Sequence, residues 1–349
     1  MPVLLRYLSL SLLLFLFACA AAPGDAGYFR CELALQHSHK LGGCAIGDLD
    51  PRYPGAEIAT VSVSGEVFVL HWEQGRWHSQ LVFRCPGEAL QCVIGDALPE
   101  QEGQELLVVG MAKGREEEAG PGAAHLIRWD GQAWQGRKIH QEAALVHGGA
   151  IGEGSLLLVG FTKQAIVFSP EAGALRLRAR VPLPGRGKTA LWRGSEYVVA
   201  CSDGSLVQIQ GSGASWQART LEKIEAGRAR LACQGQAQLL VADDDGGLRL
   251  LTASGSKKVY SEGQKLRGAG FGPFVPEHPV KGPQLACAGY EGKIVVLLPG
   301  KGGEYRPLTL FQGRERFHHL AAGSLGRRPG RALVACGYGG RVLVLRWVH

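Results

Sequence analysis

The sequence predicts an all-β protein: a seven-bladed β-propeller of four-stranded blades, closed by an N-terminal strand that completes the last blade. Three observations predict it. A unit of four short strands recurs seven times, glycine is abundant with 51 of 349 residues, and apolar and polar residues alternate with period two, as in EVFVL at 66–70. Because 46% of the residues are apolar by type, the chain can also bury a large core.

The first 22 residues are predicted to be a signal peptide rather than part of the fold. Arg6 precedes the apolar run YLSLSLLLFLF at 7–17, which is too short for a permanent membrane span, and small residues follow it. The sequence fits two alternative cleavage sites. ACA at 18–20 fits a signal peptidase, whereas LFAC resembles a bacterial lipobox that would lipidate Cys19, although Phe17 is bulkier than that pattern normally allows. We therefore expect a secreted, periplasmic or cell-surface protein, with an outer-membrane lipoprotein as the alternative.

The repeat accounts for the rest of the chain. In each unit a first strand ends near a glycine, a second of the LLVVG type reaches a turn, a third of the GxVxVL type leaves it, and a fourth begins with an aromatic. A four-stranded unit that recurs roughly every 40 to 50 residues is typical of a propeller blade. The glycines that mark the seven units are Gly47, Gly95, Gly152, Gly194, Gly235, Gly272 and Gly323.

The seventh unit, ALVACGYGGRVLVLRWVH at 332–349, lacks its fourth strand. A strand of the missing type, YFRCELAL at 28–35, stands alone before the first unit. Pairing the two would cover the exposed edge of the last blade. We therefore expect one propeller domain at 28–349.

The cysteines give a weaker signal. None has the CxxC spacing of a zinc site. Those in apolar runs are expected to be buried strand residues, whereas export would permit disulfides among Cys31, Cys44, Cys85 and Cys92, with the pairing left open.

The stretch IGDLDPRYPGAEIATVSVSGEVFVL at 46–70 resembles the FG-GAP or VCBS repeats of integrin-like and bacterial secreted propellers, and later units are similar to quinoprotein-type repeats. The resemblance implies an acidic loop that binds calcium. The candidate ligands are Asp48, Asp50 and Glu57, but Arg52 and Pro54 stand where further ligands would be expected.

A propeller binds ligands at the mouth of its central channel, which we call the funnel. Counting back five residues from each marker glycine predicts rim positions rich in His and Arg, and turn residues on the same side add tyrosines. The predicted ligand-binding residues are His147, Arg230, Arg267, His318, His319, Lys188, Tyr290 and Tyr338; Thr189 is the counted rim position of the fourth unit, and Lys163, Glu291 and Arg341 are further turn residues.

Two function classes remain open, beside a channel mouth that is merely polar and solvated. The leading hypothesis is an exported, monomeric, non-enzymatic binding or scaffold propeller that recognises an anionic glycan or a protein partner through the funnel. Protonated histidines would then attract the anion, so binding should weaken as the pH rises through about 6.5. The net charge of +7 suits an acidic partner, but export makes nucleic acid an unsuitable one, and the membrane would be reached only through a lipid on Cys19.

The alternative is a metal-assisted carbohydrate lyase or hydrolase that uses His39, His147 and His318 at the funnel mouth. No cofactor is assigned beyond calcium or a divalent transition metal. GxSxG, HExxH, Walker and dinucleotide motifs are absent from the sequence.

Overall fold

The structure is a computed structural model that describes residues 27–112, 120–224, 229–234, 236–326 and 330–348. The predicted signal peptide at 1–22, including Cys19, lies outside the described residues. Within the described part, no helix is long and apolar enough to cross a membrane.

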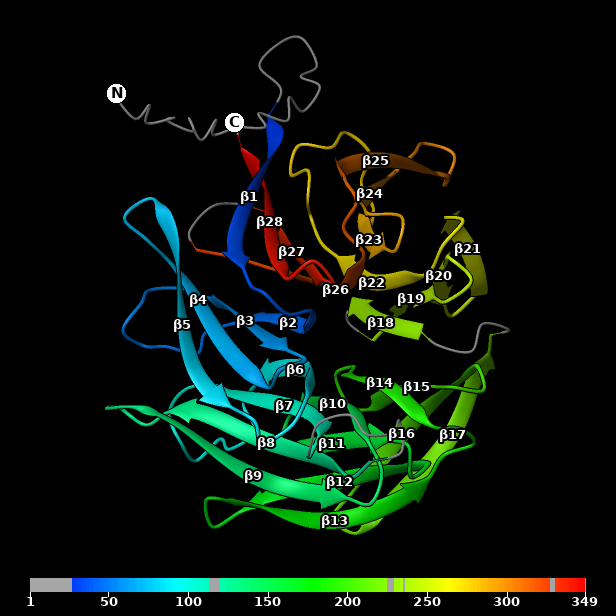
Figure 1. Ribbon diagram of the computed structural model, residues 1–349. Coiled ribbons are helices and arrows are strands. Elements are labelled where there is room, and N and C mark those ends of the chain that lie inside the picture. The colour runs from blue at the N-terminus through cyan, green and yellow to red at the C-terminus, as the bar shows by residue number, and fades with distance from the viewer. Residues whose placement is uncertain (1–26, 113–119, 225–228, 235, 327–329, 349) are drawn as a thin grey trace, which may run out of the picture.

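The described strands form seven antiparallel four-stranded sheets arranged in a ring, which confirms the predicted fold class (Figure 1). We number the sheets as blades 1–7 and give their strands from the channel outward. Blade 1 is β2 (Leu41–Gly47), β3 (Glu57–Ser62), β4 (Glu66–Glu73) and β5 (Arg76–Arg84); blade 2 is β6 (Ala89–Gly95), β7 (Glu105–Met111), β8 (Gly122–Trp129) and β9 (Trp134–Glu142); blade 3 is β10 (Val146–Gly152), β11 (Ser155–Gly160), β12 (Gln164–Glu171) and β13 (Ala174–Pro182); blade 4 is β14 (Gly187–Trp192), β15 (Tyr197–Cys201), β16 (Ser205–Ser212) and β17 (Ser215–Lys223). Blade 5 is β18 (Ala229–Gln234), β19 (Gln238–Asp243), β20 (Gly247–Thr252) and β21 (Gly255–Ser261); blade 6 is β22 (Leu266–Phe271), β23 (Leu285–Gly289), β24 (Lys293–Pro299) and β25 (Tyr305–Gln312); blade 7 is β26 (Phe317–Gly323), β27 (Ala332–Gly337), β28 (Arg341–Val348) and β1 (Tyr28–Gln36).

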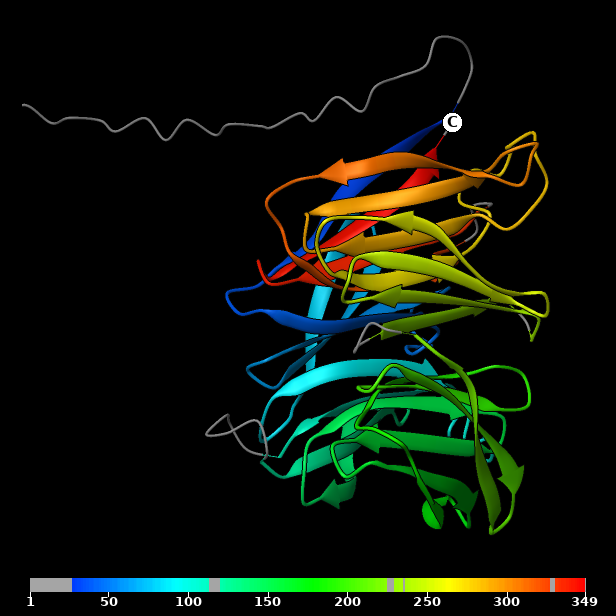
Figure 2. The ribbon, with the colours of Figure 1, turned by 90° about the vertical axis from the view of Figure 1, so that its right-hand side faces the viewer.

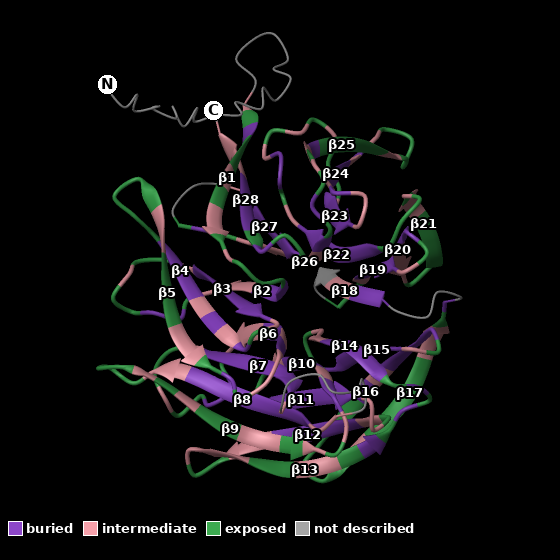
Figure 3. Cartoon of the chain, viewed as in Figure 1, coloured by how far each residue is buried: buried purple, intermediate pink, exposed green. Residues whose placement is uncertain are grey.

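Burial is greatest in the second strands and lowest in the outermost strands at the rim (Figure 3). The second strands, such as β7 with the sequence ELLVVGM, are buried along all or nearly all of their length. They are apolar on both faces because each face packs against a neighbouring blade. The outermost strands, such as β17 with the sequence SWQARTLEK, are largely exposed and alternate polar with apolar residues.

The hydrophobic core is divided among the spaces between neighbouring blades, which Figure 2 shows side-on. Val61 of blade 1 packs with Leu106 and Val108 of blade 2, and Leu41 of blade 1 packs with Val334 of blade 7. Each blade is therefore held by its two neighbours, so the ring needs its last blade as much as its first.

The closing strand β1 pairs antiparallel with β28, in a register that runs from Tyr28 opposite Val348 to Gln36 opposite Arg341. Phe29 packs edge-on against Trp347 with ring centroids 5.2 Å apart. The prediction that the N-terminal strand completes the last blade is confirmed (Figure 1).

Three of the candidate disulfide cysteines, Cys44, Cys85 and Cys92, are buried free thiols. Burial raises the pKa of Cys85 to about 12 and raises the pKa of Cys92 well above its usual value. Cys85 and Cys92 are therefore uncharged packing residues in the folded state. Because Cys44, Cys85 and Cys92 are all free in the structure, the expectation of disulfides among them is wrong.

Candidate functional site

A repeated irregularity in the innermost strands builds the mouth of the channel. In six of the seven blades as described, the pairing between the first and second strands skips one residue near the start of the first strand, and only β18 pairs without a skip. Such bulges redirect a side chain away from the regular alternation of the strand. The skipped residues are Gly42, Leu90, His147, Lys188, Arg267 and His318.

A second repeated position adds the turn residues of the funnel. In blades 3, 6 and 7 the first residue after the second strand is aromatic: Phe161, Tyr290 and Tyr338. The backbone N–H of each donates to a carbonyl just before the first strand of its own blade, for example Tyr290 N–H to Lys265 O at 2.9 Å. This bond fixes the turn over the bulge, so one blade contributes a bulge residue and an aromatic side by side.

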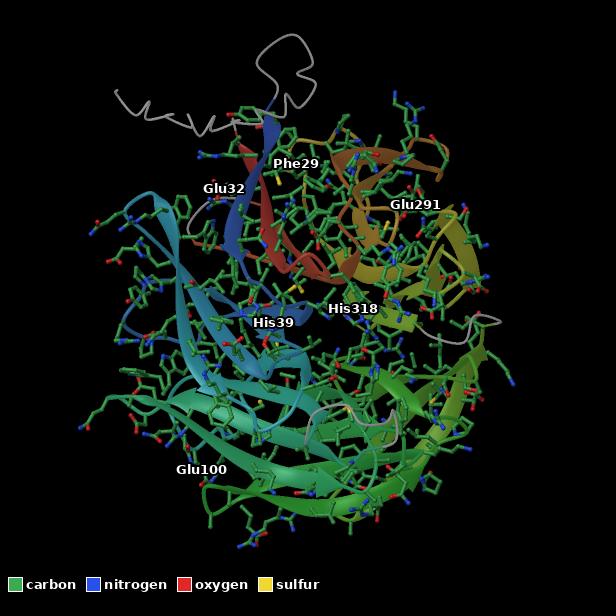
Figure 4. The ribbon with its side chains drawn as sticks, viewed as in Figure 1. Phe29, Glu32, His39, Glu100, Glu291 and His318 are labelled. Carbon is green, nitrogen blue, oxygen red and sulfur yellow. The ribbon has the colours of Figure 1, made fainter. Side chains whose placement is uncertain are left out.

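These positions enclose a cavity of about 380 Å³ at the channel mouth. Figure 4 labels His318 beside the central opening. The lining residues come from blades 2 to 7, and they are Leu90, Met111, Leu145, His147, Phe161, Lys188, Arg230, Lys265, Arg267, Tyr290, His318 and Tyr338. The structure therefore brings together seven of the eight predicted ligand-binding residues; His319 lies elsewhere.

Four of the lining side chains are cationic, and none of the described lining residues is acidic. Arg267 is buried and pairs with Asp244, with Nη2 2.9 Å from Oδ1 and 3.0 Å from Oδ2. Lys265 Nζ lies 3.6 Å from the same carboxylate. One carboxylate therefore serves two cations on this side of the funnel, which leaves a positive potential there.

On the opposite side, the ammonium group of buried Lys188 lies 3.9 Å from the centroid of the Phe161 ring. The guanidinium of Arg186 lies 4.6 Å from the same ring. The face of an aromatic ring attracts cations, so Phe161 helps to hold positive charge at this part of the rim.

The imidazoles of His147 and His318 are neutral hydrogen-bonding groups. His147 Nδ1–H donates to Lys188 O at 2.7 Å, and His318 Nδ1–H donates to Gly42 O at 2.9 Å. A carbonyl oxygen can only accept, so in each neutral ring Nε2 keeps a lone pair for a ligand hydroxyl or a metal.

The pKa of both imidazoles is strongly lowered, first by burial and then by the charge of Arg230. For His318 the pKa falls to about 3. The expectation that these two histidines are charged near neutral pH is therefore wrong, and the prediction that binding weakens as the pH rises through about 6.5 loses this basis. The Arg and Lys side chains carry the charge, and they keep it across that range.

The tyrosines close the rim between blades 6 and 7. Tyr290 O–H donates to the Tyr338 hydroxyl at 2.9 Å, and their rings meet edge to face. Burial and this hydrogen bond raise the pKa of Tyr290 to about 12. Tyr338 is half-exposed and accepts from Tyr290, so its own hydroxyl hydrogen is left to donate to a ligand.

Two predicted residues lie outside the funnel. His319 faces the next section of the channel, where its Nδ1 lies 3.5 Å from the backbone nitrogen of Cys44. His39 is exposed in the connection between β1 and β2, next to His37 (Figure 4). The structure thus places two of the three candidate metal ligands, His147 and His318, around one cavity and leaves His39 out, because His39 precedes the bulge of its blade.

The candidate calcium ligands of blade 1 have other partners. Glu57 Oε2 accepts the backbone N–H groups of Leu49 and Asp50 at 2.7 and 3.0 Å. Asp50 pairs with both Nε and Nη2 of Arg52 at 2.8 and 2.7 Å. In blade 2, Glu105 accepts two backbone N–H groups in the same way. The shared geometry of the two loops indicates that Glu57 and Glu105 anchor backbone N–H groups. Asp48 is exposed and its backbone N–H bonds to Gln104, and a calcium-ligand role for Asp48, Asp50 and Glu57 stays a prediction.

Counting from glycines missed several lining residues. Blade 4 presents Lys188 and not Thr189, because Gly194 is the second residue after β14, in a turn with φ of +71°, whereas the other markers end the first strand of their blade or directly follow it. The turn contribution falls on Phe161 and not on Lys163. The sequence does contain a pattern that predicts Phe161: it directly follows the second-strand segment LLLVG, just as Tyr290 and Tyr338 directly follow the second strands of their blades.

The fold and the site together define a seven-bladed β-propeller with a cationic funnel. Comparison with known families and with curated proteins found no match. Among solved structures, the chain is similar to the WD40 β-propeller domain of Doa1, with a TM-score of 0.65 and 11% identity over 90% of this chain and 96% of that one. At this identity the likeness shows the fold alone. The resemblance to FG-GAP or VCBS repeats stays a prediction.

Proposed function

We propose that this protein is a non-enzymatic binding propeller that recognises an anionic glycan through its funnel. The observation that carries the proposal is one cavity lined by cations of blades 4 to 6 and by two neutral imidazoles with free acceptor atoms. Cations attract a carboxylate or sulfate, whereas neutral Nε2 atoms accept from hydroxyl groups. A sugar acid offers both kinds of group on one molecule, and the Tyr338 hydroxyl and aromatic rims suit its remaining surface.

The test compares a uronic-acid oligosaccharide with the methyl ester of the same oligosaccharide, by calorimetry on the mature protein. The ester keeps the shape and the hydroxyl groups but loses the charge. We expect the acid to bind more tightly than the ester, and its affinity to fall with added salt, since the Debye length is about 8 Å at physiological ionic strength. Equal affinity for acid and ester would contradict an anionic ligand.

A pair of variants locates the site. Lys265→Gln removes a lining cation, and Lys163→Gln removes a lysine from a turn on the same face that does not line the cavity. We expect K265Q to weaken acid binding several-fold and K163Q to leave it unchanged. If both variants bind as the parent does, the funnel is not the binding site.

The alternative function is a metal-assisted carbohydrate lyase or hydrolase, and it is favoured by the two Nε2 lone pairs of His147 and His318 in one cavity. The double variant H147Q/H318Q separates the functions, because it should abolish turnover of the oligosaccharide by an enzyme but weaken binding only modestly. A protein partner with an acidic segment would use the same cations; in that case the oligosaccharide would bind weakly and an acidic peptide tightly.

Export is part of the same proposal. It rests on the apolar run at 7–17 and the small residues after it, and we propose a monomeric protein at the cell surface, in the periplasm or secreted. Mass spectrometry of the product from the native host tests it: loss of the N-terminal segment supports export, a lipid on Cys19 supports the lipoprotein form, and an intact Met1 contradicts both.

A further inference from the structure

Three potential metal ligands meet where the ring is closed, and none of them is among the residues that line the funnel cavity. His37 and His39 lie in the connection between β1 and β2, and Glu66 is the first residue of β4. One donor atom from each lies within 4.8 Å of the other two. Among the residues that the structure describes, no other group of three His, Cys, Asp or Glu side chains meets this criterion.

The carboxylate of the group is already oriented. Ser64 O–H donates to Glu66 Oε2 at 2.8 Å, and Arg84 Nη1 lies 2.7 Å from Oε1. These two contacts orient Glu66 so that its Oε2 faces the histidines, with His37 Nε2 at 2.8 Å.

His37 can present Nε2 to a metal without losing its support. Its Nδ1 lies 3.1 Å from the backbone nitrogen of His39 and 3.3 Å from the His39 carbonyl oxygen. When Nδ1 is unprotonated, it accepts a hydrogen bond from the His39 N–H. When Nδ1 carries the proton, it donates to the His39 carbonyl oxygen, and the lone pair of Nε2 is then available to a metal. A metal-bound histidine ordinarily donates its other N–H in this way.

We infer that His37, His39 and Glu66 bind one divalent transition-metal ion. Two imidazoles and a carboxylate suit Zn²⁺ or Ni²⁺ better than Mg²⁺ or Ca²⁺, which prefer oxygen ligands. Tetrahedral Zn²⁺ with bonds near 2.1 Å needs donor atoms roughly 3.4 Å apart, so the His37–Glu66 pair opens slightly and the exposed His39 side chain closes in. Water fills the fourth position.

The proposed ion would link blade 7 to blade 1. His37 N–H donates to Gly340 O at 2.7 Å, in the turn before β28, whereas Glu66 belongs to blade 1. An ion bound to both would tie the closing strand of blade 7 to its neighbour. Because binding to the folded state alone stabilises that state, the ion should raise the melting temperature.

The experiment titrates untagged mature protein with Zn²⁺ and, separately, with Mg²⁺, by calorimetry and thermal melting; Co²⁺ replaces Zn²⁺ for visible spectroscopy. We expect one Zn²⁺ per chain, no Mg²⁺ binding at the same concentrations, and a rise in melting temperature that a chelator reverses. H37Q, H39Q and E66Q should each weaken Zn²⁺ binding by at least about tenfold and abolish the rise.

The matched control is His78→Gln, which removes another histidine of blade 1 outside the group. H78Q should bind Zn²⁺ as the parent does. Because His39 is exposed, H39Q tests the site even if H37Q or E66Q fails to fold. Absence of Zn²⁺ binding, or binding that H39Q leaves unchanged, would overturn the proposal. Zn²⁺ held by His147 and His318 in the funnel would be lost in H147Q/H318Q and kept in H39Q, so the two variants distinguish the two sites.

Discussion

Glu32 of the first strand lies 2.7 Å from Arg346 of the last strand, Oε2 to Nη2, although 314 positions separate the two residues. The same Oε2 accepts from Trp77 Nε1–H of blade 1 at 3.0 Å. One largely buried carboxylate thus joins three strands of two blades at the closure of the ring. Figure 4 labels Glu32 there.

Glu32→Ala should lower the free energy of unfolding by about 2 kcal/mol, because a charged hydrogen bond is lost and Arg346 is left without this partner. Urea unfolding measures the change. The control is Glu73→Ala, which removes an exposed carboxylate of blade 1 and should change stability by no more than about 0.5 kcal/mol. Equal effects of the two substitutions would show that the closure contact contributes nothing specific.

The neutral His318 imidazole makes stability depend on pH. Its pKa is lowered to about 3 by burial and by Arg230, whereas an unfolded histidine titrates near 6.5. The unfolded chain therefore binds a proton that the folded protein excludes, and stability falls as the pH drops from about 6.5 toward 3. H318Q should reduce the slope of unfolding free energy in this window by up to about 1.4 kcal/mol per pH unit.

The matched control for this slope is Leu90→Gln, because Leu90 occupies the equivalent bulge position of blade 2 and carries no titratable group. L90Q changes packing at the channel mouth but should leave the slope as it is in the parent. A slope that H318Q does not alter would mean that His318 is not held neutral.

The pKa shift of Glu57 has the opposite direction to that of His318, so its effect on the pH dependence of stability is also opposite. Its pKa is raised to about 7, chiefly by burial, although two backbone N–H groups lower it. An unfolded glutamate titrates near pH 4.3, so between about pH 4.3 and pH 7 the folded protein binds a proton that the unfolded chain does not. The stability that this proton binding contributes is fully present below about pH 4.3 and is lost as the pH rises through about 7. Glu57→Gln keeps an acceptor and stays neutral. It should therefore gain stability relative to the parent between pH 5 and pH 8, measured by urea unfolding at both.

Glu57→Ala supplies the contrast, since it leaves the buried N–H groups of Leu49 and Asp50 without an acceptor and should cost about 1–3 kcal/mol. A relative stability of E57Q that is the same at pH 5 and pH 8 would contradict the raised pKa.

The sequence by itself determined the number of blades and the closure of the ring. Strand alternation, the recurring glycines and the unpaired strand at Tyr28–Leu35 are local patterns of the sequence. They can be recognised without knowledge of the tertiary contacts that each segment makes. The same patterns placed His147, Arg267 and His318 at the channel mouth, because the offset between bulge and glycine is constant in those blades.

The tertiary structure alone decided the chemistry of these positions. The bulge in β14 lies one residue earlier than the glycine count predicts, so it presents Lys188 in place of Thr189. Burial beside Arg230 makes His318 neutral. Glu66 reaches His37 only because blade 7 closes against blade 1. Each of these facts depends on which groups lie next to one another across blades and how far water is excluded, and those long-range neighbours are set by packing that no local pattern specifies.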